Sequence, residues 1–229
     1  MGIKATLGNP IIDFVFPRIC LVCSSNTEYL CDHCLAKIKK ARLKCLRCNK
    51  NNPFGRYCFS CEKPFLPDKI ISAFVYRDHI KNVIHQYKYE DAFILAKDLA
   101  KALLPLVRSI SGYRKFTLSF IPLSDKKFKT RGYNQAELLA REAGKLLNMR
   151  VANLMNRSTQ EETQVTSKTK RARKQNIKGV FKIKNGVSVP ANIILVDDVV
   201  TTGATVEEAT KVLKRAGAKK VVVVALAMA

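Results

Sequence analysis

From residue 69 onward, short β-rich apolar runs alternate with stretches in which apolar residues follow helical spacing. The runs that predict strands cover residues 70–76, 116–121, 151–154, 193–196 and 221–227, and the helical stretches cover residues 80–87, 92–110, 134–147 and 205–216. This alternation predicts an α/β fold with a central parallel sheet flanked by helices. Ligands of such sheets bind beyond the carboxyl ends of the strands, so we expect the chemistry in the loops after Ile121 and Val196.

The first 65 residues follow a different pattern, four C-x-x-C pairs with few large apolar residues around them. The cysteines are Cys20, Cys23, Cys31, Cys34, Cys45, Cys48, Cys58 and Cys61. Two residues between thiolates allow one tight turn to direct both sulfurs at one metal ion, and two such turns complete a tetrahedral shell. Four pairs therefore predict two zinc sites. The short gaps favour sequential pairing, first with second and third with fourth, while crossed pairing stays open.

The two zinc ions are expected to be structural, because four thiolates leave no coordination position open for water. Iron–sulfur clusters also use four thiolates, but the sequence lacks the C-x2-C-x2-C run of common ferredoxins. A segment this poor in apolar residues needs metal ligation to fold. We therefore expect a double zinc ribbon over residues 1–65 and an α/β domain over residues 66–229.

The charge of the chain indicates an anionic partner. Lys and Arg number 41 against 18 Asp and Glu, a formal net charge of +23, and 47% of the residues are hydrophobic, enough for a folded protein. No window approaches 18 uninterrupted apolar residues, and Pro10, Asp13 and Pro17 break the N-terminal apolar run. Neither a membrane span nor a signal peptide is expected. We expect a cytoplasmic protein in which the thiols stay reduced.

One loop carries explicit chemistry, the segment IILVDDVVTTGAT at residues 193–205. An apolar strand delivers two neighbouring carboxylates, Asp197 and Asp198, and a turn of Thr and Gly then opens a helix. Hydroxyls and backbone N–H groups at a helix N-terminus bind phosphate, and Gly203 permits close approach. The carboxylates suit ribose hydroxyls or a Mg2+ ion. The segment predicts a sugar-phosphate site, and a plain strand-to-helix connection capped by Thr is the alternative.

This segment resembles the 5-phosphoribosyl-1-pyrophosphate (PRPP) motif of type I phosphoribosyltransferases. The resemblance implies that Asp197 and Asp198 contact the ribose 2′ and 3′ hydroxyls and that Mg2+ accompanies PRPP. It also implies the type I phosphoribosyltransferase fold for the α/β domain. The residues that it assigns to the 5′-phosphate are Thr201, Thr202, Gly203, Ala204 and Thr205.

Two further segments extend the likeness, IPLSDKKFKTRGYNQAELLA at residues 121–140 and RSTQEETQVTSKTKRARKQNIKGVF at residues 157–181. With the zinc ribbons they make the chain similar to the ComF (ComFC) family of bacterial competence proteins. The type I pattern places a pyrophosphate-binding loop at Ser124, Asp125 and Lys126, for which a solvated basic surface is the plain alternative. The candidate lid or DNA contacts are Arg131, Gln164, Lys168, Arg171 and Asn176.

Three functions follow. The family resemblance implies a protein of DNA uptake in natural transformation, which handles single-stranded DNA with a competence helicase partner. It also implies a place close to the membrane uptake machinery. The positive charge supports binding to the phosphate backbone of DNA. The second is a phosphoribosyltransferase with an unidentified acceptor, for which PRPP binding is expected and turnover is left open. The third is a zinc-dependent scaffold in which PRPP regulates DNA or partner binding. Cations near the PRPP motif favour one basic face for both ligands.

Overall fold

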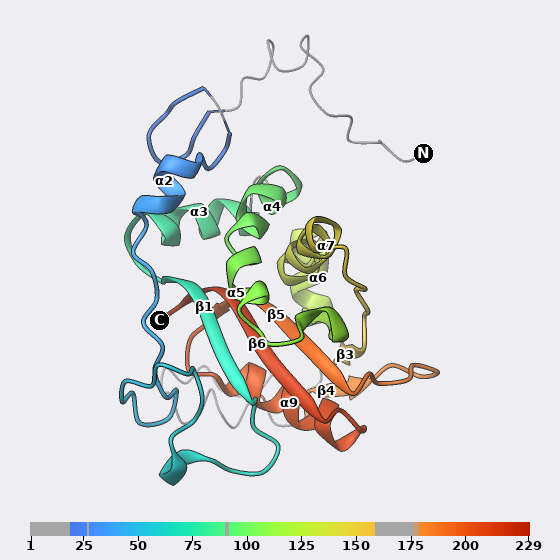
Figure 1. Ribbon diagram of the computed structural model, residues 1–229. Helices are drawn as coiled ribbons and strands as arrows, with labels where there is room; N and C mark the ends of the chain where they lie inside the picture. The colour runs from blue at the N-terminus through green and yellow to red at the C-terminus, as the bar shows by residue number, and fades with distance from the viewer. Residues whose placement is uncertain (1–18, 27, 90–91, 159–176, 178) are drawn as a thin grey trace.

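The computed structural model describes residues 19–229 except 27, 90–91, 159–176 and 178. A parallel sheet of four strands in the order β1-β6-β5-β2 forms the centre of the fold (Figure 1). The strands are β1 (Lys69–Val75), β2 (Thr117–Phe120), β5 (Asn192–Val200) and β6 (Lys220–Met228). The predicted α/β fold with a parallel central sheet is confirmed.

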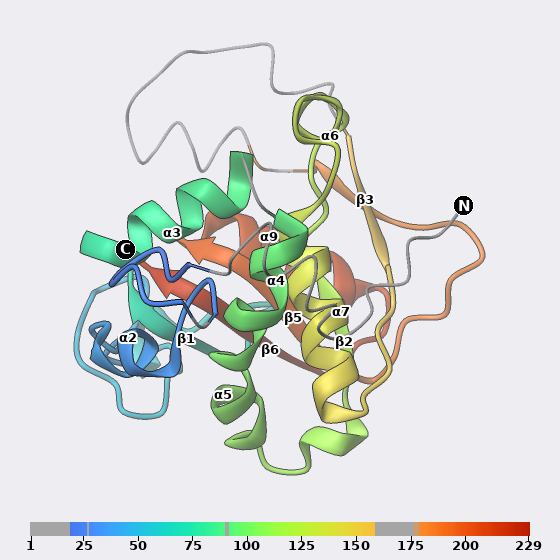
Figure 2. The same ribbon diagram turned by 90° about the horizontal axis from the view of Figure 1, so that it is seen from above.

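Alternate residues of the two central strands point to opposite faces of the sheet. Ile194 and Val222 pack on one face, and their neighbours Ile193 and Val221 pack on the other. Helices bury both faces, which explains why these strands are apolar without interruption. Figures 1 and 2 show one face under α3 (Asp78–Tyr89), α4 (Ala92–Lys101), α5 (Leu104–Arg108) and α7 (Gln135–Leu147), and the other under α9 (Ala204–Arg215).

The remaining elements are short. A two-stranded antiparallel sheet of β3 and β4 packs beside α9. Two further helices and two 3-10 turns lie in the connections. Their bounds are β3 (Met155–Arg157), β4 (Phe181–Ile183), α2 (Asp32–Lys37), α6 (Asp125–Arg131), η1 (Phe59–Cys61) and η2 (Tyr113–Lys115).

Several predicted elements differ in extent from the observed ones. The helical stretch 92–110 divides into α4 and α5, and Pro105 stands in the first turn of α5, where a residue without an N–H group is tolerated. The strand predicted at residues 151–154 is wrong, because Val151 makes only a single bridge to Leu118 and β3 begins four residues later. Helix α6 and strand β4 were not predicted, since both are too short to show a period.

The strand predicted over residues 193–196 continues to Val200, so Asp197 and Asp198 lie inside it. Pairing with β6 holds this extension, with Asp197 opposite Ala225 and Val200 opposite Met228. An apolar run cannot reveal a strand that continues through charged residues. The sheet itself therefore carries both carboxylates.

The cysteine region packs on both faces of the sheet. Cys20 and Cys34 belong to the core beneath α3 and α4, whereas Cys45 belongs to the core beneath α9. Between them, residues 39–41 run along the outer edge of β1: the Ala41 N–H donates to the Ala73 carbonyl at 3.1 Å, and the Val75 N–H donates to the Lys39 carbonyl at 3.0 Å. The chain thus crosses the sheet edge from one face to the other. The predicted domain boundary at residue 65 stays a prediction.

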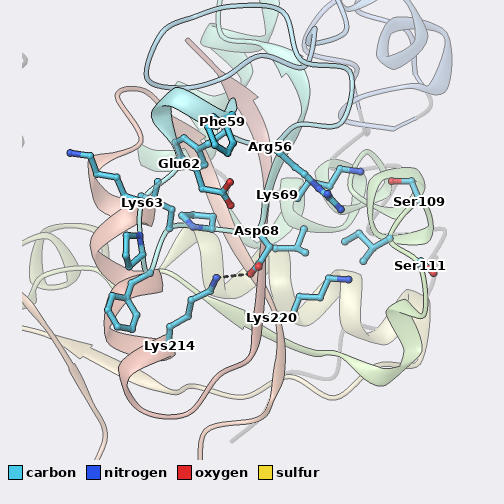
Figure 3. Close-up of a pocket in the computed structure, with 17 residues that line it drawn as sticks. Arg56, Phe59, Glu62, Lys63, Asp68, Lys69, Ser109, Ser111, Lys214 and Lys220 are labelled. Carbon is cyan, nitrogen blue, oxygen red and sulfur yellow. Dashed lines mark ion pairs between the residues drawn. The ribbon is translucent and has the colours of Figure 1, made fainter.

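Asp68 ties together the amino-terminal ends of the strands. Its carboxylate accepts a hydrogen bond from the Val221 N–H at 2.7 Å and pairs with the Lys214 ammonium of α9 at 2.9 Å (Figure 3). The contact joins the starts of β1 and β6 to the last turn of α9. The amino-terminal edge of the sheet is therefore firmly held, and the carboxyl-terminal edge is where the candidate site lies.

Candidate functional site

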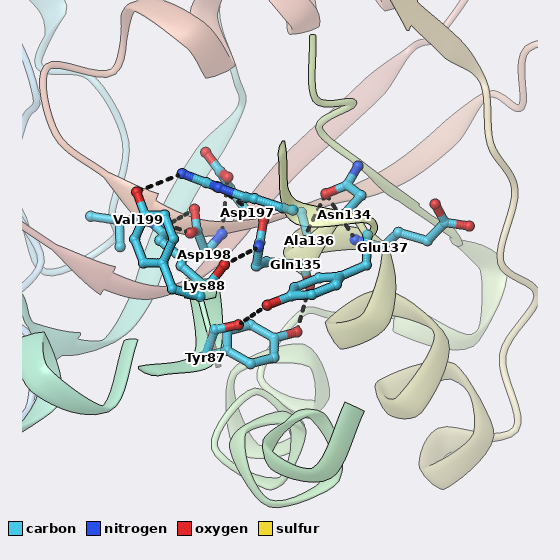
Figure 4. Close-up of polar contacts among 12 residues, drawn as sticks. Tyr87, Lys88, Asn134, Gln135, Ala136, Glu137, Asp197, Asp198 and Val199 are labelled. Atoms are coloured by element: carbon cyan, nitrogen blue, oxygen red, sulfur yellow. Dashed lines mark hydrogen bonds and ion pairs between the residues drawn. The ribbon is translucent and has the colours of Figure 1, made fainter. Parts of the chain in front are cut away.

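Two carboxylates stand at the carboxyl end of β5. Asp197 is only 8% exposed, and its carboxylate accepts a hydrogen bond from the Asp198 N–H at 2.9 Å. Asp198 accepts one from the Val199 N–H at 2.7 Å and pairs with the Lys88 ammonium at 2.7 Å (Figure 4). The two side chains are fixed by backbone donors and by one cation from the end of α3.

The surroundings make the two acids unequal. Burial, and then the charge of Asp198, raise the pKa of Asp197 well above its ordinary value. Burial acts against ionisation of Asp198 too, but the Lys88 ammonium outweighs it, and the pKa of Asp198 is lowered. Asp198 therefore ionises more readily than Asp197, and a further cation in the cavity would favour ionisation of Asp197.

A cavity of about 170 Å³ opens in front of the carboxylates. We call it the carboxylate cavity. Its wall contains positively and negatively charged side chains. The residues of the wall come from β5, α3, α6, α7, α9 and β3 and from the loop after β2. The charged and hydroxyl residues in its wall are Lys88, Lys127, Arg131, Arg157, Asp197, Asp198 and Thr205. Four cations beside two neighbouring carboxylates suit a ligand that combines hydroxyl groups with phosphates.

Arg131, a predicted lid or DNA contact, lies at the mouth of this cavity. Its guanidinium donates to the Gln135 side-chain oxygen at 3.2 Å and to the Tyr89 hydroxyl at 3.2 Å, and lies 5.0 Å from the centre of the Tyr89 ring. Gln135 in turn donates to the Lys88 carbonyl at 3.3 Å. Gly132 ends α6 with a φ of +75°, which turns the chain back toward α7. Arg131 therefore joins α3 to the junction of α6 and α7.

The predicted phosphate turn links β5 to α9. Gly203 adopts a φ of +78° and precedes the first residue of the helix, where free N–H groups point outward. Thr205 reaches the carboxylate cavity. The Thr202 hydroxyl accepts a hydrogen bond from the Ala204 N–H at 3.4 Å, and Thr201 is exposed. The structure brings the turn and the two carboxylates to one place.

The second cysteine unit, which runs from Cys45 to Cys61, contacts this turn directly. A Cβ atom added to Gly203 would come within 2.7 Å of Leu46, which lies between Cys45 and Cys48. The neighbouring Arg47 donates twice to the Glu207 carboxylate of α9, at 3.2 and 3.3 Å. The metal-binding turn thus forms the back wall of the phosphate turn.

A buried tyrosine completes the contact with Glu207. The Tyr57 hydroxyl donates to the Glu207 carboxylate at 3.0 Å, and both residues are at most 9% exposed. Burial, and then the charge of Glu207, raise the pKa of Tyr57 above its ordinary value, so the hydroxyl remains a donor. The start of α9 is thereby anchored to the cysteine region by one acid with two partners.

The predicted pyrophosphate loop has a different form. Ser124 is fully buried at the N-cap position of α6, while Asp125 and Lys126 form the exposed first turn of that helix. In the described part of the chain the carboxylate cavity touches none of the three; Asp125 instead lines a neighbouring cavity of about 910 Å³. Lys127 and Arg131 of the same helix face the carboxylates. Gln164, Lys168, Arg171 and Asn176 lie outside the described residues.

Sequence reasoning missed two cations of the cavity as site residues, Lys88 and Arg157. Lys127 belongs to the basic run around the predicted pyrophosphate loop, and Arg157 opens the segment of residues 157–181 that carries the family likeness. Lys88 had no signal, because a single cation at the end of a helix carries no local pattern. The tertiary fold alone brings it to β5.

The cysteines form two groups of four, in the sequential pairing that the spacing favoured. Within each group all sulfur atoms lie within 4.8 Å of one another; the groups are Cys20, Cys23, Cys31 and Cys34, and Cys45, Cys48, Cys58 and Cys61. The Cys23 and Cys31 sulfurs are 3.7 Å apart, and the Cys48 and Cys58 sulfurs 3.4 Å. Four sulfurs bound tetrahedrally at Zn–S distances of about 2.3 Å lie roughly 3.8 Å apart. The donor sets therefore fit structural zinc.

Comparison with known families agrees with this geometry. Residues 129–229 match the phosphoribosyl transferase domain, and residues 11–62 match the double zinc ribbon domain. An allosteric regulatory enzyme of purine biosynthesis gives a TM-score of 0.41 at 16% identity over 61% of this chain, which spans 29% of that enzyme. A hypoxanthine phosphoribosyltransferase from Staphylococcus aureus gives 0.36 at 16% identity, over 62% of this chain and 69% of that one.

Curated relatives match nearly the whole chain. Competence protein ComFC of Streptococcus pneumoniae is 29% identical over 205 residues, 88% of each protein. DNA utilization protein YhgH of Escherichia coli is 29% identical over 210 residues, 89% of this chain and 87% of that protein. Competence protein F of Haemophilus influenzae is 30% identical over 224 residues, 92% of this chain and 96% of that protein. With both domains in the expected order and a match of this extent, the chain belongs to the ComF family of competence proteins.

Proposed function

We propose that this protein serves DNA uptake and that it binds PRPP with Mg2+ in the carboxylate cavity. The observation that carries the PRPP assignment is the acid pair of β5, buried Asp197 and half-buried Asp198, next to the phosphate turn of α9. Relatives named for competence and for DNA utilization support the DNA role. The described residues form no helix long and apolar enough to span a membrane. We place the protein in the cytoplasm, close to the uptake machinery.

The proposed position of PRPP follows from the side chains that line the carboxylate cavity. Asp197 and Asp198 accept from the ribose hydroxyls, and Mg2+ supplies the cation that offsets their charge and that of the pyrophosphate. The 5′-phosphate receives N–H groups and hydroxyls from residues 201–205. The pyrophosphate meets Lys127 and Arg131 at the mouth. Lys88 must release Asp198, to which it is paired at 2.7 Å, as the sugar enters.

Calorimetric titration with Mg2+ and PRPP tests the site. Asp197→Asn combined with Asp198→Asn is expected to abolish measurable binding, because both hydroxyl acceptors lose their charge. Asp78→Asn is the matched control: Asp78 is exposed at the start of α3, its φ is +52°, and Asn tolerates that conformation. Unchanged affinity in the double variant would refute the assignment of the carboxylate cavity to PRPP.

One observation favours turnover as a second candidate function. The cavity of about 910 Å³ adjoins the carboxylate cavity and shares Leu123, Asn134 and Arg157 with it. An acceptor seated there would lie next to the ribose, as a phosphoribosyltransferase requires. Release of pyrophosphate from PRPP in the presence of candidate acceptors measures this activity. If no acceptor produces release while PRPP still binds, the role of PRPP is regulatory, as in a zinc-dependent scaffold.

Single-stranded DNA and a competence helicase are the proposed macromolecular partners. The net charge of +23 supports a surface that neutralises phosphates without reading bases. Co-purification of the helicase with the tagged full chain, compared in the presence and absence of PRPP, tests the second partner. The DNA partner raises the question of where on the molecule a strand is held.

A further inference from the structure

A groove of about 880 Å³ lies at the amino-terminal edge of the sheet, away from the carboxylate cavity. We call it the amino-edge groove. The second cysteine unit forms one wall, and the starts of β1 and β6 form another (Figure 3). Ser109 and Ser111, which follow α5, close the far end. Since parallel strands all run from this edge to the other, the two cavities lie at opposite ends of the sheet.

The groove is strongly basic. Its cations are Arg56, Lys63, Lys69, Lys214 and Lys220. Its anions are Glu62 and Asp68, and Lys214 pairs with Asp68 at 2.9 Å. Arg56, Lys63 and Lys220 are exposed and available to a ligand. A row of cations in a concave surface attracts a chain of phosphates rather than a single one.

An exposed aromatic residue stands in the same wall. Phe59 is 97% exposed although it is a large apolar side chain, and it sits in η1 between two cysteines of the second group. Phe65, at the other side of the groove, is 43% exposed and lies 5.6 Å from the Arg215 guanidinium. Packing against the described residues does not account for the Phe59 ring. A flat apolar partner such as an unpaired base would cover it.

We propose that the amino-edge groove binds single-stranded nucleic acid. The cations follow the backbone phosphates, and a base stacks on Phe59. Stacking requires bases that are not already stacked in a duplex, which favours a single strand. The assignment rests on the proposed DNA role. It places DNA at the opposite edge of the sheet from PRPP, in place of the single basic face that the sequence favours for both ligands. Both ligands can therefore be bound at one time.

The test measures fluorescence anisotropy of a labelled oligothymidylate with the zinc-loaded full chain at several salt concentrations. Arg56→Gln combined with Lys220→Gln removes two phosphate contacts and is expected to lower the slope of log K against log salt by about 1.4, at about 0.7 per contact. Phe59→Ala is expected to weaken binding roughly 5- to 150-fold. PRPP affinity is expected to stay unchanged in all these variants.

Matched controls separate the groove from the general charge. Lys81→Gln combined with Lys97→Gln removes two exposed cations of α3 and α4, and Phe54→Ala removes an aromatic residue of the same cysteine unit that is 68% exposed outside the groove. If the groove variants bind like these controls, the proposal is overturned. If only the charge variant weakens binding, the groove holds the phosphate backbone alone, and base stacking on Phe59, with the preference for a single strand, is overturned. If the unaltered protein does not bind the oligonucleotide, the DNA role fails as well, whereas PRPP binding is judged separately.

Discussion

Asp197 and Asp198 are neighbours in β5, but their surroundings differ. Both could be predicted as site residues, because a strand end and a helix start are contiguous in the sequence and their chemistry can be read together. The difference between their pKa values could not be predicted. It depends on Lys88, which pairs with Asp198 and not with Asp197, and on the burial of Asp197 in the sheet. The residues next to the two acids in the sequence indicate neither.

The raised pKa of Asp197 predicts a pH dependence of PRPP binding. Mg2+ and PRPP favour the ionised carboxylate, so the pKa of Asp197 falls on binding and a proton leaves. The affinity for PRPP is therefore highest above the pKa that Asp197 has in the free protein, and it decreases as the pH falls below that pKa. Calorimetry in two buffers of different ionisation enthalpy measures the number of protons released, which is expected to rise as the pH is lowered through the pKa of Asp197 in the free protein.

The Asp78→Asn control is expected to release the same number of protons as the unaltered protein. A proton count of zero at every pH would show that Asp197 is already ionised before the ligand arrives, and would contradict the asymmetry of the pair.

At the scale of elements, α9 begins against the second metal-binding turn. The cysteine spacing was enough to predict that turn, but the two residues within it follow no pattern. Only the fold reveals that Leu46 backs Gly203 and that Arg47 binds Glu207. A similar limit applied to α6, where the sequence predicted a loop and the structure has a short helix.

Arg47 and Glu207 are expected to be energetically coupled. Arg47→Met leaves a buried acid with one partner fewer and is expected to lower the free energy of unfolding by roughly 1–3 kcal/mol. Adding Glu207→Gln removes the uncompensated charge, so the double variant is expected to lose less than the sum of the single losses. Urea denaturation of the zinc-loaded protein measures all three.

Arg141→Met provides the comparison, because Arg141 pairs with Glu137 on the exposed face of α7. Such a pair contributes no more than about 0.5 kcal/mol. Equal losses for Arg47→Met and Arg141→Met would refute the anchoring role of the metal-binding turn.

At the scale of the whole molecule, the cysteine region contributes to the cores on both faces of the sheet. The first cysteine group joins the core of one face and the second group joins the core of the other. Two units in sequence could be predicted from the change in pattern. The packing of the first unit along the edge of the sheet could not be predicted, because residues 39–41 pair with β1 through an isolated bridge, which leaves no periodic pattern in the sequence.

Removal of both metals is therefore expected to loosen the sheet edge selectively. Hydrogen exchange after chelation is expected to speed up at the amides of Ala41 and Val75, which bond across that edge, while Ile194 and Leu195 in β5 keep their protection. Adding zinc back is expected to restore the protection of the Ala41 and Val75 amides. Protection of Ala41 and Val75 that survives complete loss of metal would contradict this coupling.

Residues 39–41 also determine what the molecule presents to its neighbours. Strand β1 is the last strand of the sheet on its side, and it is rich in Ile, Ala and Phe. An open edge of this composition recruits strands from other chains, and natural proteins protect such edges. Chains whose cysteines are oxidised or not yet loaded would therefore be driven to join one another through β1, and metal supply during synthesis becomes a condition for keeping the molecules apart.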